Sequence, residues 1–403
     1  MSTAAGESGP TAREELLQRA ASLVPMLRQR ASACEAARSC PAETVEDFRR
    51  NGLLRICQPA RYGGFELGWD VLAEVTQTLA RGCASQAWIA MVYNDHCQLL
   101  GSFPIEAQDE VWRDKPDTFL SASLDPIGKA KRVAGGALYS GRHSFSSGID
   151  HVQWVICGGR FEDSDGASYF VVPKREITLI DDWQVMGLAG TGSKSFIVDN
   201  VFVPEHRILP VQAATDEGTG PGTLVNRAPV YRAPRSGIAP VPFAAITIGI
   251  AEGFLEEYLR YTRPRKSRGT PMAELMGTQI AAGRAAAEIE AAARLNITTA
   301  REVMAMLARG EPVPQRQRFR VRCNAAIAAQ LALGAVQQLF NMAGGRTLYQ
   351  SNALQRLVRD MLAAATHYGL DWNIAAANYG RDLLGGAESA SGSPLTPQRG
   401  LPG

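Results

Sequence analysis

The sequence predicts an α+β protein in which a helical part is followed by a β part and then by a second helical part. Apolar residues recur at helical spacing from about residue 12 to 115 and again from about 237 to 386. Between them, residues 116–210 form short β-branched or alternating runs divided by Gly, Asp and Pro. A chain of 403 residues is long enough for two or three domains. We therefore expect an N-terminal α-helical domain, a central β domain and a C-terminal helical domain.

The N-terminal part carries a separate signal for each of its helices. TAREELLQRAASLVPMLRQRA has acidic residues early and arginines late, as the helix dipole favours. ETVEDFRRNG ends at Gly52, a residue type that commonly stops a helix. ASQAWIAMVYNDHCQLLGSF is apolar on nearly every face, so we expect it to form a buried helix.

The central and C-terminal parts differ in their residue patterns. The strand-like runs are FLSASL, KRVAGGALYSGRHSFSSG, HVQWVICGGRF, ASYFVVPKREITLI and KSFIVDNVFVP. The turn-rich stretch at 211–236 is expected to be a loop. Beyond it, EIEAAARLNITTAREVMAML and VRCNAAIAAQLALGAVQQLFNMAG predict long helices. We expect the two ends, residues 1–11 and 387–403, to be flexible tails.

Composition and charge exclude several classes of partner. The net charge of +2 does not favour a nucleic acid or an anionic membrane surface. No apolar run approaches the roughly 20 residues of a membrane span, and the N-terminus lacks a signal-peptide pattern. The seven cysteines are scattered without a C-x-x-C pair, which favours free thiols in a reducing compartment. We expect a cytoplasmic protein.

Two glycine-containing motifs attract attention for different reasons. MGLAGTGSKS (186–195) resembles a phosphate-binding loop, but Ser193 stands where that loop needs its lysine, and a strand pattern follows instead of a helix. A glycine turn between strands explains it better. GRHSFSSGIDHVQW (141–154) places small hydroxyls beside Gly148, where a flat ligand could approach the backbone; a β-turn is the alternative.

Histidine is rare, with five residues in the chain, and two of them occur in helix-like segments. His96 lies in the apolar segment before the β part. His367 lies in LAAATHYGLDW with Asp371 four residues later, so on a continuous helix the two would share one face. The aspartate would then fix the imidazole tautomer and raise its pKa. A buried, hydrogen-bonded core histidine is the alternative, and no histidine spacing suggests a metal site.

Taken together, these segments resemble the acyl-CoA dehydrogenase fold over about residues 12–386. The loop WQVMGLAGTGSKSFIVDNVFVPEHRIL, with GTGS followed by VFVPE, is typical of that superfamily. FSSG and the H-x-x-x-D element at 367–371 are more similar to its flavin-dependent monooxygenase branch, the oxygenase components of two-component aromatic hydroxylases. The resemblance implies a central β-barrel domain, a C-terminal four-helix bundle and a homotetramer.

The resemblance also implies a reaction. A separate flavin reductase would supply FADH2 or FMNH2, which would react with O2 to form a C4a-hydroperoxyflavin. Its distal oxygen would hydroxylate a small phenol- or indole-type molecule. Three alternatives stay open: N- or S-oxygenation within the same branch, acyl-CoA dehydrogenation, and a catalytically idle scaffold on this fold that would bind no flavin. A dehydrogenase needs a glutamate base, which ATHYGLDW lacks, although Glu252, Glu256 and Glu257 follow the β part.

Site residues follow from the same resemblance. Ser147 matches the hydroxyl that contacts flavin N5, Phe145 lies beside the flavin ring, and Ser123 in FLSASL is a weaker candidate for flavin contact. His367 matches the histidine near the hydroperoxide, with Asp371 as its orienting partner.

Three further features of the chain have roles implied by the resemblance. His96 matches a histidine that faces the aromatic substrate. Arg263 and Arg268, in the basic cluster RPRKSR, are candidates to reach the flavin phosphate across a subunit interface; a solvated helix face is the usual explanation of such a cluster. The loop at 211–236 would cover the substrate entrance.

Overall fold

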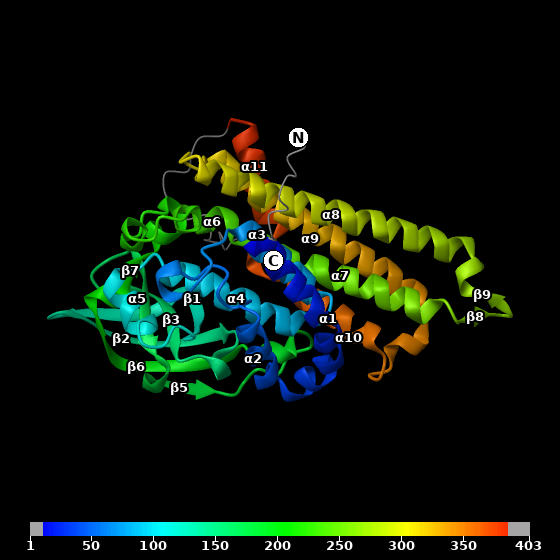
Figure 1. Cartoon of the computed structure of the whole chain (residues 1–403), viewed down its shortest axis with the longest axis horizontal. Coiled ribbons are helices and arrows are strands. Elements are labelled where there is room, and N and C mark those ends of the chain that lie inside the picture. The colour runs from blue at the N-terminus through cyan, green and yellow to red at the C-terminus, as the bar shows by residue number, and fades with distance from the viewer. Residues whose placement is uncertain (1–10, 386–403) are drawn as a thin grey trace, which may run out of the picture.

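The computed structural model describes residues 11–385, and its first part is helical (Figure 1). Nearly all of both expected tails lies outside the described residues. The five N-terminal helices are α1 (Ala12–Ala37), α2 (Ala42–Arg50), α3 (Trp69–Ala80), α4 (Ala84–Leu100) and α5 (Ile105–Trp112). Thr11 begins α1 with a capping box, in which its side chain and that of Glu14 each bond the other residue's backbone N–H. The helices expected from the sequence are thus present in this part.

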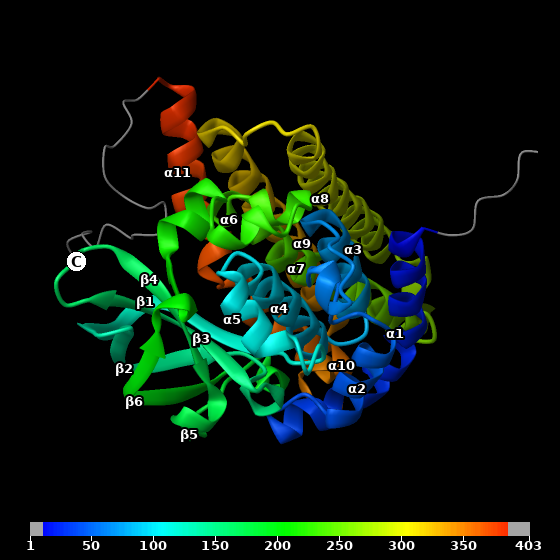
Figure 2. The same cartoon turned by 60° about the vertical axis from the view of Figure 1, so that its left-hand side comes forward.

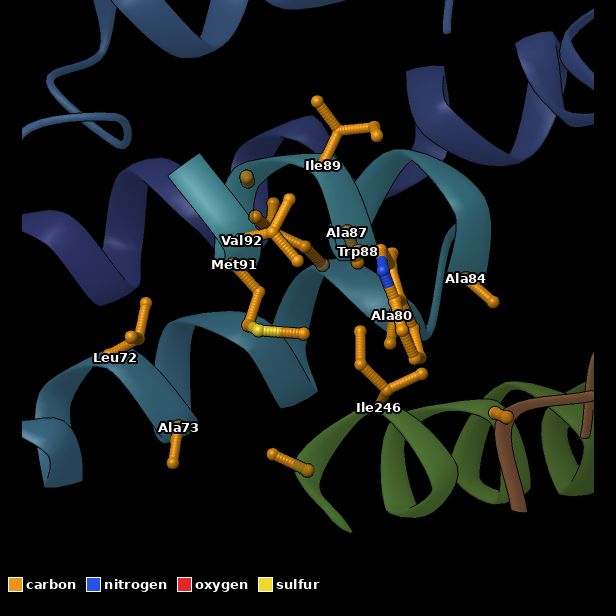
Figure 3. Packing of buried hydrophobic residues seen from close by; sticks show 14 of the residues in the cluster. Leu72, Ala73, Ala80, Ala84, Ala87, Trp88, Ile89, Met91, Val92 and Ile246 are labelled. Atoms are coloured by element: carbon orange, nitrogen blue, oxygen red, sulfur yellow. The ribbon is translucent and has the colours of Figure 1, made fainter. Parts of the chain in front are cut away.

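Helix α4 is the centre of the molecule. Every one of its residues is buried, as the apolar pattern predicts. It packs against α3, the bundle helix α7 (Pro240–Thr262) and strand β1 (Leu120–Val133), so it lies between the sheet and the C-terminal helices (Figure 2). In Figure 3 the Trp88 side chain of α4 points toward Ile246 of α7. Different faces of this one helix therefore contact the sheet and the C-terminal helices.

The central part is one mixed sheet of seven strands. Their order is β5-β6-β2-β1-β3-β4-β7, and every neighbouring pair is antiparallel except β1 and β3. Strands β4 and β6 also touch although three strands separate them in this order, so the sheet curls back on itself in the manner of the expected barrel. After β1, the strands are β2 (Gly136–Ser146), β3 (Trp154–Phe161), β4 (Ala167–Pro173), β5 (Ile177–Ile180), β6 (Lys194–Pro204) and β7 (Ile208–Pro210).

The C-terminal part is a bundle built around α7, which packs against α8, α9 and α10. The long helices run side by side toward the β8–β9 hairpin at the end far from the sheet (Figure 1). Its remaining elements are α6 (Arg235–Ile238), β8 (Lys266–Ser267), β9 (Thr270–Pro271), α8 (Met276–Ala308), α9 (Gln315–Ala343), α10 (Ala353–Ala365) and α11 (Trp372–Leu383).

The stretch at 211–236 has more structure than the expected loop. It contains a π-helical turn (Ala213–Glu217) and two 3-10 turns (Pro221–Leu224 and Pro229–Arg232). The Gly222 N–H donates to Ser102 O over 3.0 Å. Proline begins both 3-10 turns, where its missing N–H costs nothing. The segment is therefore held against the C-terminal end of α4.

Within residues 11–385, two helical stretches are long and apolar enough to cross a membrane by length and composition alone, Arg235–Thr262 and Gln315–Ala343. In the first, 78% of the apolar window is buried inside the protein. The core helix of a bundle passes the same test, because it must be apolar on all its faces.

Candidate active site

His96 lies two turns after Trp88 on α4, so the two side chains share a face. Its Nδ1 is 2.8 Å from the carbonyl oxygen of Leu120, at the start of β1. A carbonyl only accepts, so Nδ1 carries the proton and Nε2 keeps its lone pair. Burial lowers the pKa of His96, with Asp95 opposing that effect. This histidine therefore presents a hydrogen-bond acceptor.

A buried ion pair lies directly beside His96. Arg235 Nη2 donates to Asp95 Oδ2 over 2.8 Å, and Arg235 Nη1 donates to the Asp95 carbonyl and to Gln98 Oε1. Both side chains of the pair are about 95% buried. Asp95 Oδ1 is buried and has no hydrogen-bond partner within residues 11–385. Sequence reasoning missed this pair; the adjacent acid and histidine in NDH were the available signal.

His367 is held in an aromatic slot and not in a helix. Its ring stacks on Phe243 with centroids 3.7 Å apart and meets the edge of Trp88 at 5.8 Å. The Gly369 N–H donates to His367 Nδ1 over 3.2 Å, which leaves the ring proton on Nε2. Burial lowers the pKa of His367 to about 3, against the rise expected from the sequence. The structure thus brings His367 and Trp88 together, and the charge of Asp95, the neighbour of His96, also acts on the His367 pKa.

The expected face shared by His367 and Asp371 is wrong. Helix α10 ends at Ala365, and a 3-10 turn (Tyr368–Leu370) separates the two residues. Asp371 is exposed and caps α11, accepting from the Ile374 N–H over 2.9 Å. No hydrogen bond joins it to His367 in the described part of the chain. The prediction from helical spacing was wrong because Gly369 lies in a tight turn that changes the direction of the backbone.

Ser147 is the meeting point of three segments. It follows β2 just before Gly148, whose φ of 71° is a left-handed conformation that favours glycine. Ser147 Oγ accepts from Trp88 Nε1–H over 3.1 Å and lies 2.7 Å from Ser193 Oγ. Ser193 Oγ in turn lies 2.7 Å from Thr191 Oγ1. The GTGS loop therefore supplies hydroxyls to the FSSG turn, a role that sequence reasoning did not assign.

The surroundings of Ser147 suit a flat aromatic cofactor. Phe145 is 70% exposed with a φ of 58°, a costly conformation for a bulky residue, and its ring meets Trp183 edge-on at 5.9 Å. Ser123 is buried on β1, two residues from Ser121 and on the same face. Ser121 is the more directly placed of the two, since its hydroxyl donates to the Ser147 carbonyl over 2.8 Å. An exposed ring beside a buried hydroxyl fits the flat face and polar edge of a flavin.

Comparison with known proteins identifies the family. The families described as Acyl-CoA dehydrogenase, N-terminal domain and C-terminal domain match residues 12–115 and 241–372. The flavin-dependent monooxygenase oxygenase subunit HsaA of Rhodococcus jostii is 31% identical over 380 residues, which cover 92% of this chain and 98% of that protein. The FADH(2)-dependent resorcinol hydroxylase oxygenase component of a Rhizobium strain is 31% identical over 391 residues, with 92% and 94% covered.

A solved structure agrees with these relatives. The HsaA monooxygenase from M. tuberculosis aligns with a TM-score of 0.89 at 31% identity, covering 95% of this chain and 100% of that one. This chain belongs to the flavin-dependent monooxygenase branch of the acyl-CoA dehydrogenase family. The expected fold class and enzyme class are therefore confirmed.

The three glutamates that could have served a dehydrogenase are engaged elsewhere in this oxygenase. Glu252 accepts from Gln77 Nε2 over 2.7 Å, and Glu256 accepts from Arg28 over 2.6 Å and also binds Arg81. Glu257 pairs with Arg260 on its own helix. The contacts of Glu252 and Glu256 tie α7 to α1 and α3, and the largest effect on Glu252 is burial, which raises its pKa. Two of the acids are thus used in helix packing and the third in an ion pair along α7.

Arg263 and Arg268 are not brought to the rest of the site within one chain. Both are exposed, and they lie where α7 ends and at the β8–β9 hairpin. That hairpin is at the end of the bundle away from the sheet (Figure 1). Any contact with flavin bound at Ser147 would have to come from another copy of the oxygenase.

Proposed function

We propose that this oxygenase component takes FADH2 or FMNH2 from a separate flavin reductase and uses O2 to hydroxylate a small, neutral phenol- or indole-type molecule in the cytoplasm. The observation that carries the substrate class is the pair of acceptors at the polar end of the site, His96 Nε2 and Asp95 Oδ1. The Asp95 charge acts on the pKa of His367, so this polar end lies near the aromatic slot of Phe243, His367 and Trp88.

Flavin would be held on the sheet side of the site. Ser147 would contact N5, Phe145 would lie against the ring, and Ser123 would add a weaker contact. Once bound in its reduced form, the flavin supplies the two electrons and activates O2 for transfer to the substrate. The burial of α4 and of the Ser147 cluster supports this role, because excluding water protects reactive oxygen species from wasteful loss.

The polar end of the slot favours a substrate that donates a hydrogen bond and carries no negative charge. Arg235 is already neutralised by Asp95, so it has little attraction left for a substrate carboxylate. A buried acceptor left without a partner costs about 1–3 kcal/mol, which a phenol O–H or an indole N–H would recover. His96, neutral at Nε2, is placed to accept or withdraw that proton. Electron density released toward the ring would promote attack by electrophilic oxygen.

His367 has a different role from His96. With its proton on Nε2, it offers a donor beside the Trp88 edge, and its lowered pKa keeps it neutral at physiological pH. A fixed donor in a buried site can orient transferred oxygen without a change of charge. Stacking on Phe243 supports this by holding the ring in one plane.

C-hydroxylation is favoured over N- or S-oxygenation by the relatives. The p-hydroxyphenylacetate 3-hydroxylase oxygenase component of Acinetobacter baumannii is 29% identical over 375 residues, beside the resorcinol hydroxylase. Structures of a dibenzothiophene monooxygenase and a methanesulfinate monooxygenase are 20% and 23% identical and share the fold alone. Aromatic carbon is therefore the proposed site of oxidation.

The deciding experiment uses the purified protein, chemically reduced FADH2 or FMNH2, and 18O2. We expect one 18O atom in the product from a neutral dihydroxybenzene, and about tenfold lower kcat/KM for the corresponding dihydroxybenzoate, because Arg235, the cation beside His96, is already paired with Asp95. Equal rates for the two would remove the charge argument. No 18O in any phenol or indole, with bleaching of bound oxidised flavin by an acyl-CoA, would replace the proposal with dehydrogenation.

A further inference from the structure

The hydroxyl groups around Ser147 form a chain whose hydrogen-bond directions are all determined. Thr191 Oγ1–H donates to the Leu188 carbonyl over 2.8 Å. Because a threonine hydroxyl has one proton, the 2.7 Å contact between Thr191 and Ser193 requires Ser193 to be the donor. The proton of Ser193 is then used, so Ser147 must donate across its own 2.7 Å contact to Ser193.

The direction at the other end of this series of hydrogen bonds is fixed by Trp88. An indole Nε1–H only donates, and it donates to Ser147 Oγ over 3.1 Å. The order is therefore Trp88 to Ser147 to Ser193 to Thr191 to the Leu188 carbonyl. Every proton points toward the GTGS loop. Ser147 Oγ keeps one lone pair, and its single proton is committed to Ser193.

The final acceptor of this chain is itself anchored. Leu188 has a φ of 53°, a left-handed conformation that is uncommon for a branched residue. Its N–H donates to the buried Asp360 of α10 over 2.7 Å. The neighbouring Gly187 lies so close to the Arg359 carbonyl that an added Cβ would be 2.1 Å from that oxygen. These contacts with helix α10 thus hold the loop in a conformation in which the Leu188 carbonyl accepts from Thr191.

We propose that Ser193 and Thr191 are positioning residues that make Ser147 a hydrogen-bond acceptor toward the cofactor, so that the site selects reduced over oxidised flavin. The inference rests on the proposed placement of Ser147 at flavin N5. Reduced flavin carries N5–H, a donor that suits the lone pair of Ser147. Oxidised flavin carries an N5 lone pair, which would face the Ser147 lone pair without a proton between them. A component that receives reduced flavin and must release the oxidised form would benefit from this difference.

Neighbouring hydroxyls supply a matched control. Ser146 Oγ lies 2.6 Å from Ser121 Oγ, and Ser121 donates to the Ser147 carbonyl, so this second pair contacts the Ser147 backbone and not its hydroxyl. Ser146 and Ser193 are both buried serines. Replacing either removes one buried hydroxyl, but only the change at Ser193 frees the Ser147 proton.

The experiment measures dissociation constants for oxidised and reduced flavin with the whole protein, the reduced form under anaerobic conditions. For Ser193→Ala we expect the ratio of the oxidised to the reduced constant to fall about tenfold, since the freed Ser147 proton can turn toward oxidised N5. Thr191→Val should lower the ratio in the same direction. Ser193→Thr, which keeps the hydroxyl, and Ser146→Ala should leave it near the wild-type value.

A second measurement needs no flavin. In protein labelled with 15N at the tryptophan indoles, Ser193→Ala should shift the Trp88 N–H resonance, assigned with Trp88→Phe, toward a weaker hydrogen bond; Ser146→Ala should not. An unchanged ratio in Ser193→Ala, or an unmoved Trp88 resonance, overturns the selection mechanism while flavin binding by the wild type still supports the proposed function. If the wild type binds neither form of flavin, both proposals fail.

Discussion

At His96 and His367 the two imidazole rings carry their protons on opposite nitrogens. His96 Nδ1–H donates a hydrogen bond to the Leu120 carbonyl, whereas His367 Nδ1 accepts from the Gly369 N–H. The first ring therefore offers an acceptor at Nε2 and the second offers a donor. A substrate hydroxyl and a transferred oxygen need these opposite partners, so the backbone groups that fix each tautomer also assign each histidine its proposed role.

The first residue-scale prediction concerns His367→Phe. Phenylalanine keeps the stacking on Phe243 but removes both ring nitrogens, so hydroxylation should fall by about 10²-fold while the melting temperature at pH 7.5 stays close to the wild type. His367→Ala should lower both, because it also loses the stacked ring. If His367→Phe hydroxylates at the wild-type rate, the histidine has a packing role alone.

The pH dependence of stability gives a second test of His367, in which His367→Phe is compared with the wild type. The pKa of His367 is lowered to about 3 in the folded protein from an ordinary value of 6.5, so the unfolded chain binds this proton more readily. Its contribution to stability is complete above pH 6.5 and is lost as the pH falls toward 3. His367→Phe should therefore lose less stability than the wild type between pH 6.5 and 4, measured by denaturant unfolding at each pH. An identical loss would show that His367 is not buried in its neutral form.

At the scale of elements, the sequence predicted what depends on local pattern. Helix α4 could be foreseen because its apolar residues cover every face, and the curled sheet because strand runs alternate with turn residues. The end of helix α10 at Ala365 could not be foreseen, because Thr366 and His367 carry no strong helix-stop signal and Gly369 is tolerated in helices. The NDH segment signalled an acid beside His96, but the pairing of Asp95 with Arg235 could not be predicted, because 140 residues separate the two along the chain.

The element-scale prediction compares two helix caps. Asp371 caps α11 through the Ile374 N–H, and Asn352 caps α10 through the Leu354 N–H, with lengths of 2.9 and 3.0 Å. Replacing either residue by alanine should lower the free energy of unfolding by about 1 kcal/mol and leave hydroxylation per folded molecule unchanged. Asn352→Ala is the matched control. A much larger loss of turnover in Asp371→Ala than in Asn352→Ala would show that Asp371 acts in catalysis as well as in helix capping.

At the scale of the whole molecule, the proposed ring site and the two arginines proposed for the flavin phosphate lie apart within one chain. The hydroxyl chain, the aromatic slot and the Asp95–Arg235 pair gather around α4, whereas Arg263 and Arg268 lie at the far end of the bundle (Figure 1). That end also exposes large apolar side chains, including Met276, Ile280, Leu348 and Tyr349. We propose a homotetramer in which this end of one copy approaches the flavin of another.

The prediction at this scale uses the cofactor's phosphate as the probe. Arg263→Ala and Arg268→Ala should weaken binding of FMNH2 by about tenfold, the value of a lost charge-assisted hydrogen bond, and leave binding of reduced riboflavin unchanged because it has no phosphate. Lys266→Ala, which removes an exposed cation from the same hairpin, is the control and should change neither affinity.

Sedimentation should give a tetramer for the wild type and for all three variants, so that a loss of affinity is not a loss of assembly. A monomer that binds FMNH2 as tightly as the assembled protein would exclude any contribution from a second copy, and equal losses for both flavins would place the arginines' effect away from the phosphate.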